Sequence, residues 1–432
     1  MKKKIFQSFK AAMIFSFVVI IMLSFVATAS ATNGYFSHGY STKNKALGGT
    51  GTALPLDSLA ASTNPAGMVF MVDRIDLGVS FFNPNREYTV SGTPSGAPGS
   101  FPLQTGTVES DSNWFIVPSL GANWKINNDS SLGISIFGNG GMNTDYDKAT
   151  FNYVNPALPS ETGVDLMQLF IMPTYARKIT PKHAFGISPI LAYQAFEAKG
   201  LEIFGALGFS NNADKLTGNG HDNSYGYGAR IGYLGEVLPG LYLGASYQTV
   251  LKMSRFKDYE GLFAEDSDFD IPQNWSIGLA YNVTPAITVA ADVQKIYYSD
   301  VASVNNPLMN NLMTSKLGKD SGAGFGWDDM TIYKVGVQWQ SGPEWIWRAG
   351  YSYGEQPIPE SEVLFNIIAP GVIEQHVTAG VTKKMGDKQE LDLTVTRGLS
   401  NSVKGKNPLD PAQKIELTMD QWEISLGYSY KF

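Results

Sequence analysis

Hydrophobic and polar residues alternate one by one through much of the chain. In the C-terminal segment QWEISLGYSYKF, every second side chain from Trp422 to Phe432 is apolar, and the residues between them are polar or small. A period of two places successive side chains on opposite faces, so this segment predicts a β-strand with one apolar face and one polar face. The same alternation recurs in segments that begin near residues 75, 275, 287, 333, 345 and 391.

The connections between these segments differ in length. The tight ones read NNDS, TPKH, LPG, NVTP, SGPE and MGDK, and the extended ones cover residues 199–223, 255–271, 300–329 and 401–418. A soluble antiparallel sandwich also alternates apolar and polar residues, but it has no reason to sort its loops by length. Short turns at one end, long loops at the other and aromatic residues at strand ends are typical of an outer-membrane barrel.

We therefore predict an all-β fold, a transmembrane antiparallel β-barrel of about 14 strands. A bacterial single-chain barrel has an even number of strands, and this count agrees with that rule. The strands are expected near residues 74–88, 113–124, 131–143, 164–178, 183–198, 224–236, 241–254, 272–282, 286–299, 330–340, 345–353, 372–384, 389–400 and 420–432.

The first residues predict export. Four lysines precede an apolar run from Ala11 to Ala27, and the small residues Ala29, Ser30 and Ala31 follow it. A retained membrane anchor is the alternative, but a small-residue triplet directly after the run is typical of a signal peptide cleavage site. We interpret residues 1–31 as a signal peptide and expect the bacterial outer membrane as the destination.

Composition narrows the functional classes. Loss of residues 1–31, which hold four lysines and no acid, takes the formal net charge from −7 to −11, and no basic run remains to neutralise phosphates. We expect no nucleic-acid partner. The chain has no cysteine, which excludes disulfides and thiolate chemistry. After residue 31 no apolar run reaches the eighteen residues of a spanning helix.

The segment from residue 32 to 73 does not alternate. It is rich in Gly, Ala, Ser and Thr, and it ends in a turn at Asn64 and Pro65. A barrel of about 14 strands has a lumen that must either conduct or be filled. Small residues allow close backbone packing, so we expect this segment to fill the lumen; a disordered tail is the alternative.

The run NGYFSHGYSTKNKALGGTGTALPLDSLAASTNPAGM resembles the N-terminal hatch of the FadL-type family, outer-membrane channels for long-chain fatty acids and other hydrophobic compounds. The signal peptide, strand count and terminal Phe432 agree with this resemblance over the whole chain. It implies a hatch at residues 32–73, a barrel at 74–432, no cofactor and no bound metal. It also implies a monomer surrounded by outer-membrane lipid and lipopolysaccharide. The run is closer to the toluene and xylene branch than to the fatty-acid branch. The hatch turn comprises Asn64, Pro65, Ala66 and Gly67.

The resemblance implies transport without chemistry. A hydrophobic solute is caught by an external groove, displaces the hatch and leaves sideways at a kink in the third strand. That strand ends here as IFGNGGMNTDYD, and glycine inside a strand permits a bulge. Gly138, Gly140 and Gly141 are therefore candidates for a lateral opening, with an ordinary flexible loop edge as an equal alternative.

Two loop segments are candidates for the groove, because apolar residues in an external loop indicate binding. The alternative is that each loop packs against itself. The candidate residues are Leu201, Ile203, Phe204, Leu207 and Phe209 in the first segment, and Leu308, Met309, Leu312 and Met313 in the second.

A fatty acid would also need a cation for its carboxylate. By strand parity Arg230, Lys334 and Arg348 point into the lumen. The commoner arrangement for such cations is pairing with inward acids such as Asp292 and Asp392, and we favour it.

Other classes have less support. The four histidines, His38, His183, His221 and His376, lie beside no serine motif, so a barrel enzyme is disfavoured. The run EDSDFD offers Asp266, Asp268 and Asp270 for calcium but lacks the glycine and distal glutamate of an EF-hand loop. A non-specific porin remains the main alternative, and the hatch-like segment argues against it. The choice between a fatty acid and an aromatic hydrocarbon stays open.

Overall fold

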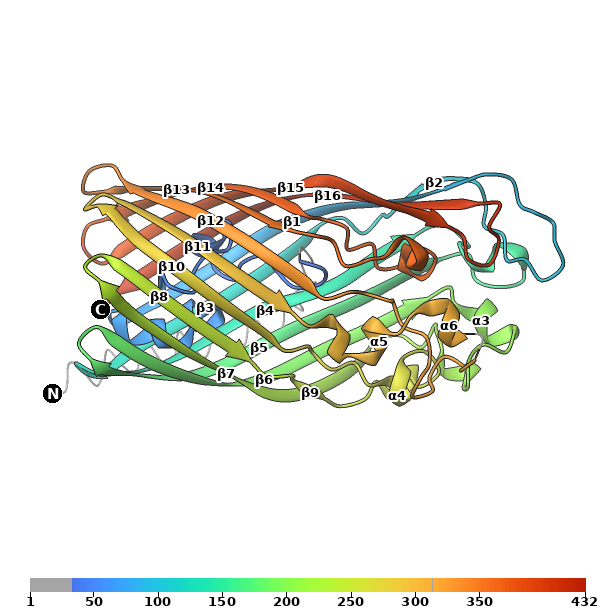
Figure 1. Cartoon of the computed structure of the whole chain (residues 1–432), viewed down its shortest axis with the longest axis horizontal. Coiled ribbons are helices and arrows are strands. Elements are labelled where there is room, and N and C mark those ends of the chain that lie inside the picture. The colour runs from blue at the N-terminus through green and yellow to red at the C-terminus, as the bar shows by residue number, and fades with distance from the viewer. Residues whose placement is uncertain (1–32, 313) are drawn as a thin grey trace.

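The computed structural model describes residues 33–312 and 314–432. Sixteen strands in this part of the chain form one antiparallel sheet, in which β2 and β9 are short additions to β1 and β7. The other fourteen close into a barrel, because β16 pairs with β1 from Lys431 opposite Arg74 to Lys414 opposite Ser91 (Figure 1). The predicted architecture is confirmed.

The strands run up and down in sequence order around the ring. Their bounds are β1 Arg74–Ser91, β2 Gly106–Glu109, β3 Phe115–Asn127, β4 Ser130–Tyr146, β5 Thr162–Thr180, β6 His183–Lys199, β7 Asp222–Leu238, β8 Leu241–Gln248, β9 Lys252–Met253, β10 Asn274–Thr284, β11 Ile287–Ile296, β12 Met330–Gln340, β13 Trp345–Gly354, β14 Gln375–Met385, β15 Gln389–Lys406 and β16 Lys414–Lys431.

The two ends of the barrel differ, as the connection lengths predict. The C-terminus and the short turns lie at one end, and the long loops lie at the other (Figure 1). The long loops carry the short helices α3 Glu202–Ala206, α4 Ala264–Ser267, α5 Ala302–Asn305 and α6 Leu308–Leu312. The N-terminal segment carries α2 Thr42–Lys45 and the 3₁₀ turns Ala60–Ser62 and Pro65–Phe70. Within the described residues, no helix has the length and apolarity that a bilayer crossing requires.

The in-and-out alternation inverts along the strands. On β16, the inward residues Gln421 to Ser429 are polar, and their outward neighbours Trp422, Ile424 and Leu426 are exposed apolar residues. Closer to the long loops the inward positions become apolar, with Ile415, Leu417 and Met419 all buried. The first pattern suits a wall between lipid and a polar lumen, and the second suits a wall between water and an apolar core.

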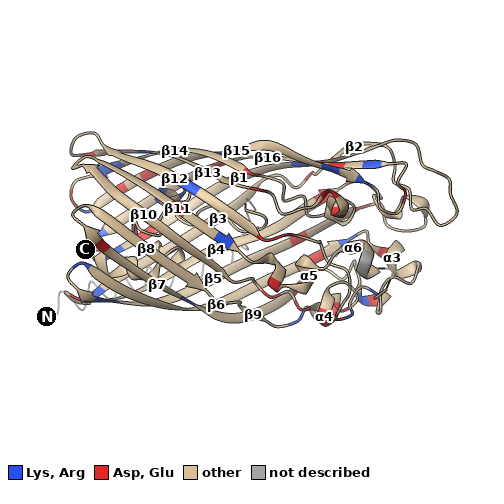
Figure 2. Ribbon diagram, in the orientation of Figure 1, with Lys and Arg blue, Asp and Glu red and all other residues tan. Residues whose placement is uncertain are grey.

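This inversion explains where the strand predictions fell short. Residues 401–418 were expected to be a long loop, but β15 and β16 continue as a hairpin in which Val403 pairs with Leu417 and Lys404 with Glu416. On the long-loop side of this inversion the outward residues are charged. The strands were predicted from apolar outward residues, so that signal is lost there. The sheet still continues, because the inward apolar residues pack against the loops. Charged residues gather mainly towards the two ends of the ribbon (Figure 2).

The interior has two parts. At the long-loop end, one large cluster of buried apolar side chains joins the loops to the upper strands and includes Trp327, Tyr298, Tyr146 and Phe204. At the short-turn end, a smaller cluster of mostly small residues includes Ala61, Ala66 and Met68 of the N-terminal segment. The N-terminal segment therefore lies against the polar part of the wall.

Candidate transport pathway

The N-terminal segment, residues 33–73, lies within the ring of strands. Most of its side chains are buried, and it contacts strands on several sides of the barrel. The backbone N–H of Gly48 donates to Thr378 on β14 at 2.9 Å, and the Thr394 hydroxyl on β15 donates to the Thr42 carbonyl at 2.8 Å. Ser58 N–H donates to Asp76 on β1 at 2.8 Å. Its backbone polar groups are thus satisfied by the lumen wall.

Buried ion pairs fix the part of the segment around Lys43 and Lys45. Lys43 pairs with Glu390 on β15 and lies 3.6 Å from Asp392, and Lys45 pairs with Glu423 on β16. All five side chains are almost fully buried. Breaking such a pair leaves one buried charge uncompensated, so these contacts hold the segment in a single position.

The turn at Asn64, Pro65, Ala66 and Gly67 is seated on the opposite wall. The Asn64 side chain accepts from Ala66 N–H at 3.0 Å, which caps the 3₁₀ turn, and its amide donates to the carbonyls of Thr52 and Tyr233 at 2.7 and 2.8 Å. Glycines of the wall make room for it: a Cβ on Gly232 would lie 2.0 Å from the Asn64 side-chain oxygen. The turn is therefore built against β6 and β7.

The barrel wall has a gap in strand pairing beside Gly138 and Gly140. β3 pairs with β1 as far as Phe115, but it pairs with β4 only as far as Ser119 opposite Phe137. Pro118 lies in the stretch that has lost its β4 partner, and proline has no N–H to donate. Between Gly138 and Gly140 the register with β5 also shifts by one residue. The glycines thus mark an irregularity in the third strand of the ring.

The N-terminal segment takes the place of β3 at this gap. The carbonyl of Asn139 accepts from Ser37 N–H, and Gly141 N–H donates to the Tyr35 carbonyl, both at 2.9 Å. A Cβ on Gly140 would lie 1.7 Å from that same Tyr35 oxygen. Gly140 is therefore required by the close approach of the segment as well as by the bulge.

The candidate groove residues meet in the large apolar cluster. Leu201, Ile203, Phe204, Leu308 and Leu312 are buried in it, Phe209 and Met309 pack against it, and Leu207 is 53% exposed. The loop after α3 is bridged to the segment after α6, because the Leu317 N–H donates to the Phe209 carbonyl at 2.8 Å. Met313 lies outside the described residues. The two segments thus form one apolar mass, and their role as a groove stays a prediction.

The three candidate cations differ in their location and in their hydrogen-bond partners. Arg230 and Lys334 line the same small cavity of about 20 Å³ beside the N-terminal segment. Lys334 donates to the His38 carbonyl at 3.2 Å and to Gln294 at 2.9 Å, whereas Arg230 donates to Gln248 at 2.5 Å. Arg348 lies elsewhere and donates to Gln338 and Thr382 at 2.8 and 2.6 Å.

The expected pairing of these cations with Asp292 and Asp392 is not found. Across residues 33–312 and 314–432, Arg230, Lys334 and Arg348 have no carboxylate oxygen within ion-pair distance. The acids are used by other partners: Asp292 accepts from the N–H groups of Gly51 and Thr52 at 2.8 and 3.0 Å, and Asp392 lies beside Lys43. The acids hold the N-terminal segment instead.

The other acidic and histidine positions have local roles. Asp266 pairs with Arg255 at 3.3 Å and Asp270 pairs with Lys252, both in the loop that carries α4. His38 stacks on His376 with ring centroids 5.1 Å apart. His221 lies 2.9 Å from Asp165. Within the described residues, no three His, Asp or Glu side chains are placed to hold a metal ion together.

The model of the outer membrane protein transport protein family (OMPP1/FadL/TodX) matches residues 23–432 of the chain. The chain belongs to this FadL/TodX family.

Solved structures show the same fold. The Pseudomonas putida toluene transporter TodX superposes with a TM-score of 0.66 at 19% identity, covering 91% of this chain and 99% of TodX. A Pseudomonas aeruginosa FadL homologue gives a TM-score of 0.70 at 14% identity, covering 92% of this chain and all of the homologue. The Ralstonia pickettii toluene transporter TbuX gives 0.63 at 16% identity, covering 91% and 99%. Among curated proteins, none matches the chain.

Membership of the FadL/TodX family places the chain in the bacterial outer membrane and identifies it as a transport channel for hydrophobic compounds. The family and these structural relatives are channels, not enzymes. The short-turn end, which also holds the C-terminus, is the end that faces the periplasm in such barrels. The large apolar cluster then lies at the external end.

Sequence reasoning missed two parts of this pathway in the FadL/TodX channel. Tyr35 and Phe36, which stand beside β4 at the gap, lie in the quoted N-terminal run but gave no periodic signal. Arg86 on β1 was also missed, although its parity is that of the inward residues Arg74, Asp76 and Ser80. Following every second residue of β1 from Arg74 onwards would have identified Arg86 as an inward side chain.

Proposed function

We propose that this channel takes up hydrophobic compounds, either long-chain fatty acids or aromatic hydrocarbons, by passive transport. Support for the compound class comes from the family and from the toluene transporters and the FadL homologue that share the fold. The solute is captured among the apolar external loops, where Leu207 is exposed beside the buried cluster. A large apolar mass next to water offers such a solute a favourable first site.

The N-terminal segment acts as a hatch in this proposal. It fills the polar lumen, and two of its parts are attached differently. Ion pairs that are buried hold the Lys43 and Lys45 region, whereas two backbone hydrogen bonds to β4, a hydrogen bond to the Tyr298 hydroxyl and aromatic packing hold the Tyr35 region. Net hydrogen bonds of this kind contribute about 1 kcal/mol each, less than a buried ion pair whose loss costs about 3 to 5 kcal/mol. The buried aromatic rings of the Tyr35 region stabilise it as well, but a hydrophobic solute can replace those apolar contacts, so this region is the part that a solute displaces.

The solute then leaves sideways through the wall. The observation that supports this step is the missing β3–β4 pairing at Phe115 to Pro118, where the N-terminal segment from Tyr35 to Thr42 lies on the inner side. A hydrophobic solute gains about 0.8 kcal/mol for each methylene that passes from water into the bilayer. Exit into the periplasm offers no such gain.

A reversible crosslink across the gap tests lateral exit. A Cβ on Gly138 would lie 3.2 Å from Cγ1 of Val117, so the pair Val117→Cys and Gly138→Cys brings two sulfurs within bonding reach. The chain has no other cysteine. Oxidation should stop uptake of a labelled alkylbenzene or fatty acid, and reduction should restore it. The matched control is Ala122→Cys with Ile134→Cys, which links β3 and β4 where they already pair.

Two results count against this proposal. Uptake that continues in the oxidised Val117→Cys and Gly138→Cys protein would show that the gap is not the exit. Free permeation of small sugars through the wild-type protein would instead support the alternative, a non-specific porin.

We further propose that the channel works as a monomer in contact with outer-membrane lipid and lipopolysaccharide. Exposed apolar side chains are carried by strands from every part of the ring, including Ile116 on β3, Ile231 on β7 and Val335 on β12. A wall that is apolar all round needs lipid rather than another protein copy on each side.

A further inference from the structure

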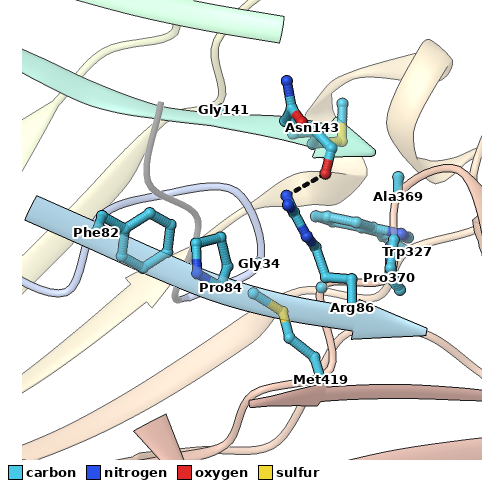
Figure 3. Close-up of a pocket in the computed structure, with 12 residues that line it drawn as sticks. Gly34, Phe82, Pro84, Arg86, Gly141, Asn143, Trp327, Ala369, Pro370 and Met419 are labelled. Atoms are coloured by element: carbon cyan, nitrogen blue, oxygen red, sulfur yellow. Dashed lines mark hydrogen bonds between the residues drawn. The ribbon is translucent and has the colours of Figure 1, made fainter. Parts of the chain in front are cut away.

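Arg86 breaks the pattern of the strand on which it lies. Near the long-loop end of β1 the inward residues Phe82, Tyr88 and Val90 are apolar and buried, and Arg86 shares their face and is only 6% exposed. Figure 3 shows its guanidinium in the middle of a pocket formed by β1, β4, β16 and the loops that carry Trp327 and Pro370. A buried charge in an otherwise apolar setting is expensive, so it needs a specific reason.

The guanidinium is held in place but only partly satisfied. One nitrogen, Nη1, donates to the Asn143 carbonyl on β4, and the group lies 5.5 Å from the ring centre of Phe115. Among the described residues, Nε and Nη2 of Arg86 have no hydrogen-bond partner, and no carboxylate lies within ion-pair distance. The nearby acid Asp165 is occupied by the Asn143 amide at 2.9 Å and by His221.

A second arginine on the same strand shows what this edge of a guanidinium binds. Arg74 also points inward from β1, and its Nε and Nη2 donate to the two carboxylate oxygens of Asp76 at 2.8 and 2.5 Å. These are the same two nitrogens that lack partners in Arg86. The parallel pair of donors matches the two oxygens of one carboxylate.

The rest of the pocket is apolar. Phe82, Pro84, Met142, Trp327 and Met419 line it around a cavity of about 20 Å³, close to the space of a single water molecule. Phe82 pairs with Phe115, the residue at which β3 begins beside the pairing gap. A single cation within an apolar lining suits one negative charge on a hydrophobic body better than a phosphate of higher charge.

We infer that Arg86 forms a carboxylate-binding site beside the strand gap, so that the channel binds hydrophobic monocarboxylates there in preference to neutral hydrocarbons. This inference rests on the proposed function and names its substrate class. The fixed Nη1 contact and the Phe115 ring preorganise the guanidinium, and its Nε and Nη2 edge has no partner within the described residues. Both nitrogens are buried, so the side chains around the small cavity must move apart to admit the carboxylate. The hydrophobic body of the ligand then lies among the apolar side chains that lead to the gap.

The test compares an acid with its own neutral ester. Equilibrium binding of radiolabelled dodecanoate and of methyl dodecanoate is measured on the purified full-length channel in a neutral maltoside detergent. Wild type should bind the acid about tenfold or more tightly than the ester, because hydrogen bonds to an ionised carboxylate are among the strongest in proteins and the ester has no charge. Arg86→Met should lower affinity for the acid by that factor and leave affinity for the ester within about twofold.

Arg397→Met is the matched control, because Arg397 also lies over an aromatic ring, Trp422 at 4.8 Å, but pairs with Asp420 on the outer face. It should change neither affinity. Arg86→Lys keeps the charge without the paired donors and should give an intermediate loss for the acid.

Unchanged acid binding in a folded Arg86→Met channel overturns the inference. Equal binding of acid and ester by the wild-type protein, a comparison that needs no variant, overturns it as well. If both probes bind and are taken up equally, the proposed transport stands without this site; if wild type binds and transports neither, the proposed function itself fails.

Discussion

The two halves of the barrel interior are held together by opposite means. Next to the periplasmic turns, the N-terminal segment is fixed by charges and backbone hydrogen bonds, such as Lys45 with Glu423 and Gly51 with Asp292. Next to the external loops, the interior is an apolar mass in which Tyr35, Tyr298 and Trp327 have ring centroids 5.2 to 5.9 Å apart. The two meet at Tyr35 and Phe36, beside the gap in the wall.

The difference has a physical consequence. Buried ion pairs and hydrogen bonds have strict geometry, so they set one position for the hatch. Apolar contacts are non-directional, so the members of such a cluster can exchange partners without leaving a polar group unsatisfied. In the proposed transport, a hydrophobic solute would therefore enter the external half first, before the Tyr35 region is displaced.

The largest expected effect comes from breaking the polar half. Lys45→Met leaves Glu423 buried without its partner, which should cost about 3 to 5 kcal/mol of hatch stability. We expect larger single-channel conductance in planar bilayers and faster proteolysis of residues 33–73. The control is Lys404→Met, which removes an exposed pair with Glu416 and should cost less than about 1 kcal/mol. Equal conductance of the two variants would show that the ion pair does not hold the hatch.

The next effect acts where the two halves meet. Gly140→Ala places a Cβ 1.7 Å from the Tyr35 carbonyl oxygen, a backbone atom that must move. Overpacking against backbone costs up to about 3 kcal/mol, so the Tyr35 region should detach and hydrogen exchange of Ser37 and Gly141 amides should accelerate. Gly138→Ala is the control, since its Cβ would lie 3.2 Å from the Val117 side chain and at an ordinary contact distance of 3.9 Å from the Gln168 carbonyl oxygen. Protected amides in both variants would contradict this account of the gap.

These contrasts show what could be read from the sequence. The strands follow from a period of two, and β12 was predicted with its observed bounds, Met330–Gln340. The hairpin of β15 and β16 was missed beyond the membrane, because alternation inverts where water replaces lipid outside and loops replace the lumen inside. Periodicity reports the solvent on each face, and it becomes ambiguous where those solvents change.

The candidate pathway was less predictable than the fold. Gly140 was found from composition, but its partner, the backbone of Tyr35, lies more than 100 positions earlier in the chain, so no local pattern connects the two. Likewise the roles of Asp292 and Asp392 depend on which hatch groups reach them. Contacts between a non-periodic segment and a barrel wall are set by three-dimensional packing alone.

A smaller effect is expected from the apolar half. In Trp327→Phe the indole N–H that donates to Asn366 at 2.6 Å is lost while most of the ring volume remains. The buried Asn366 oxygen then lacks a donor, which should cost about 2 kcal/mol of local stability. Hydrogen exchange in residues 360–370 should rise, and the heat-modifiable mobility of the barrel should stay unchanged. The exposed Trp114→Phe is the control, and loss of barrel folding in Trp327→Phe would show that the two halves are coupled.

The smallest effect concerns a titratable group in the external loops. Burial, together with the neighbouring Asp270, raises the pKa of Asp268 from 3.8 to about 6. A carboxyl group with a raised pKa in the folded state binds its proton more tightly there, so its contribution to loop stability is complete below pH 3.8 and is lost as the pH rises through about 6. Asp268 is half exposed, and water screens its repulsion from Asp270, so the loss should stay below about 1 kcal/mol.

Hydrogen exchange of residues 254–272, corrected for intrinsic rates, should therefore be somewhat faster at pH 7.5 than at pH 4.5. Asp268→Asn, which cannot ionise, should remove this difference, whereas the exposed Asp320→Asn should keep it. A pH dependence that persists in Asp268→Asn would assign it to another group of the loop.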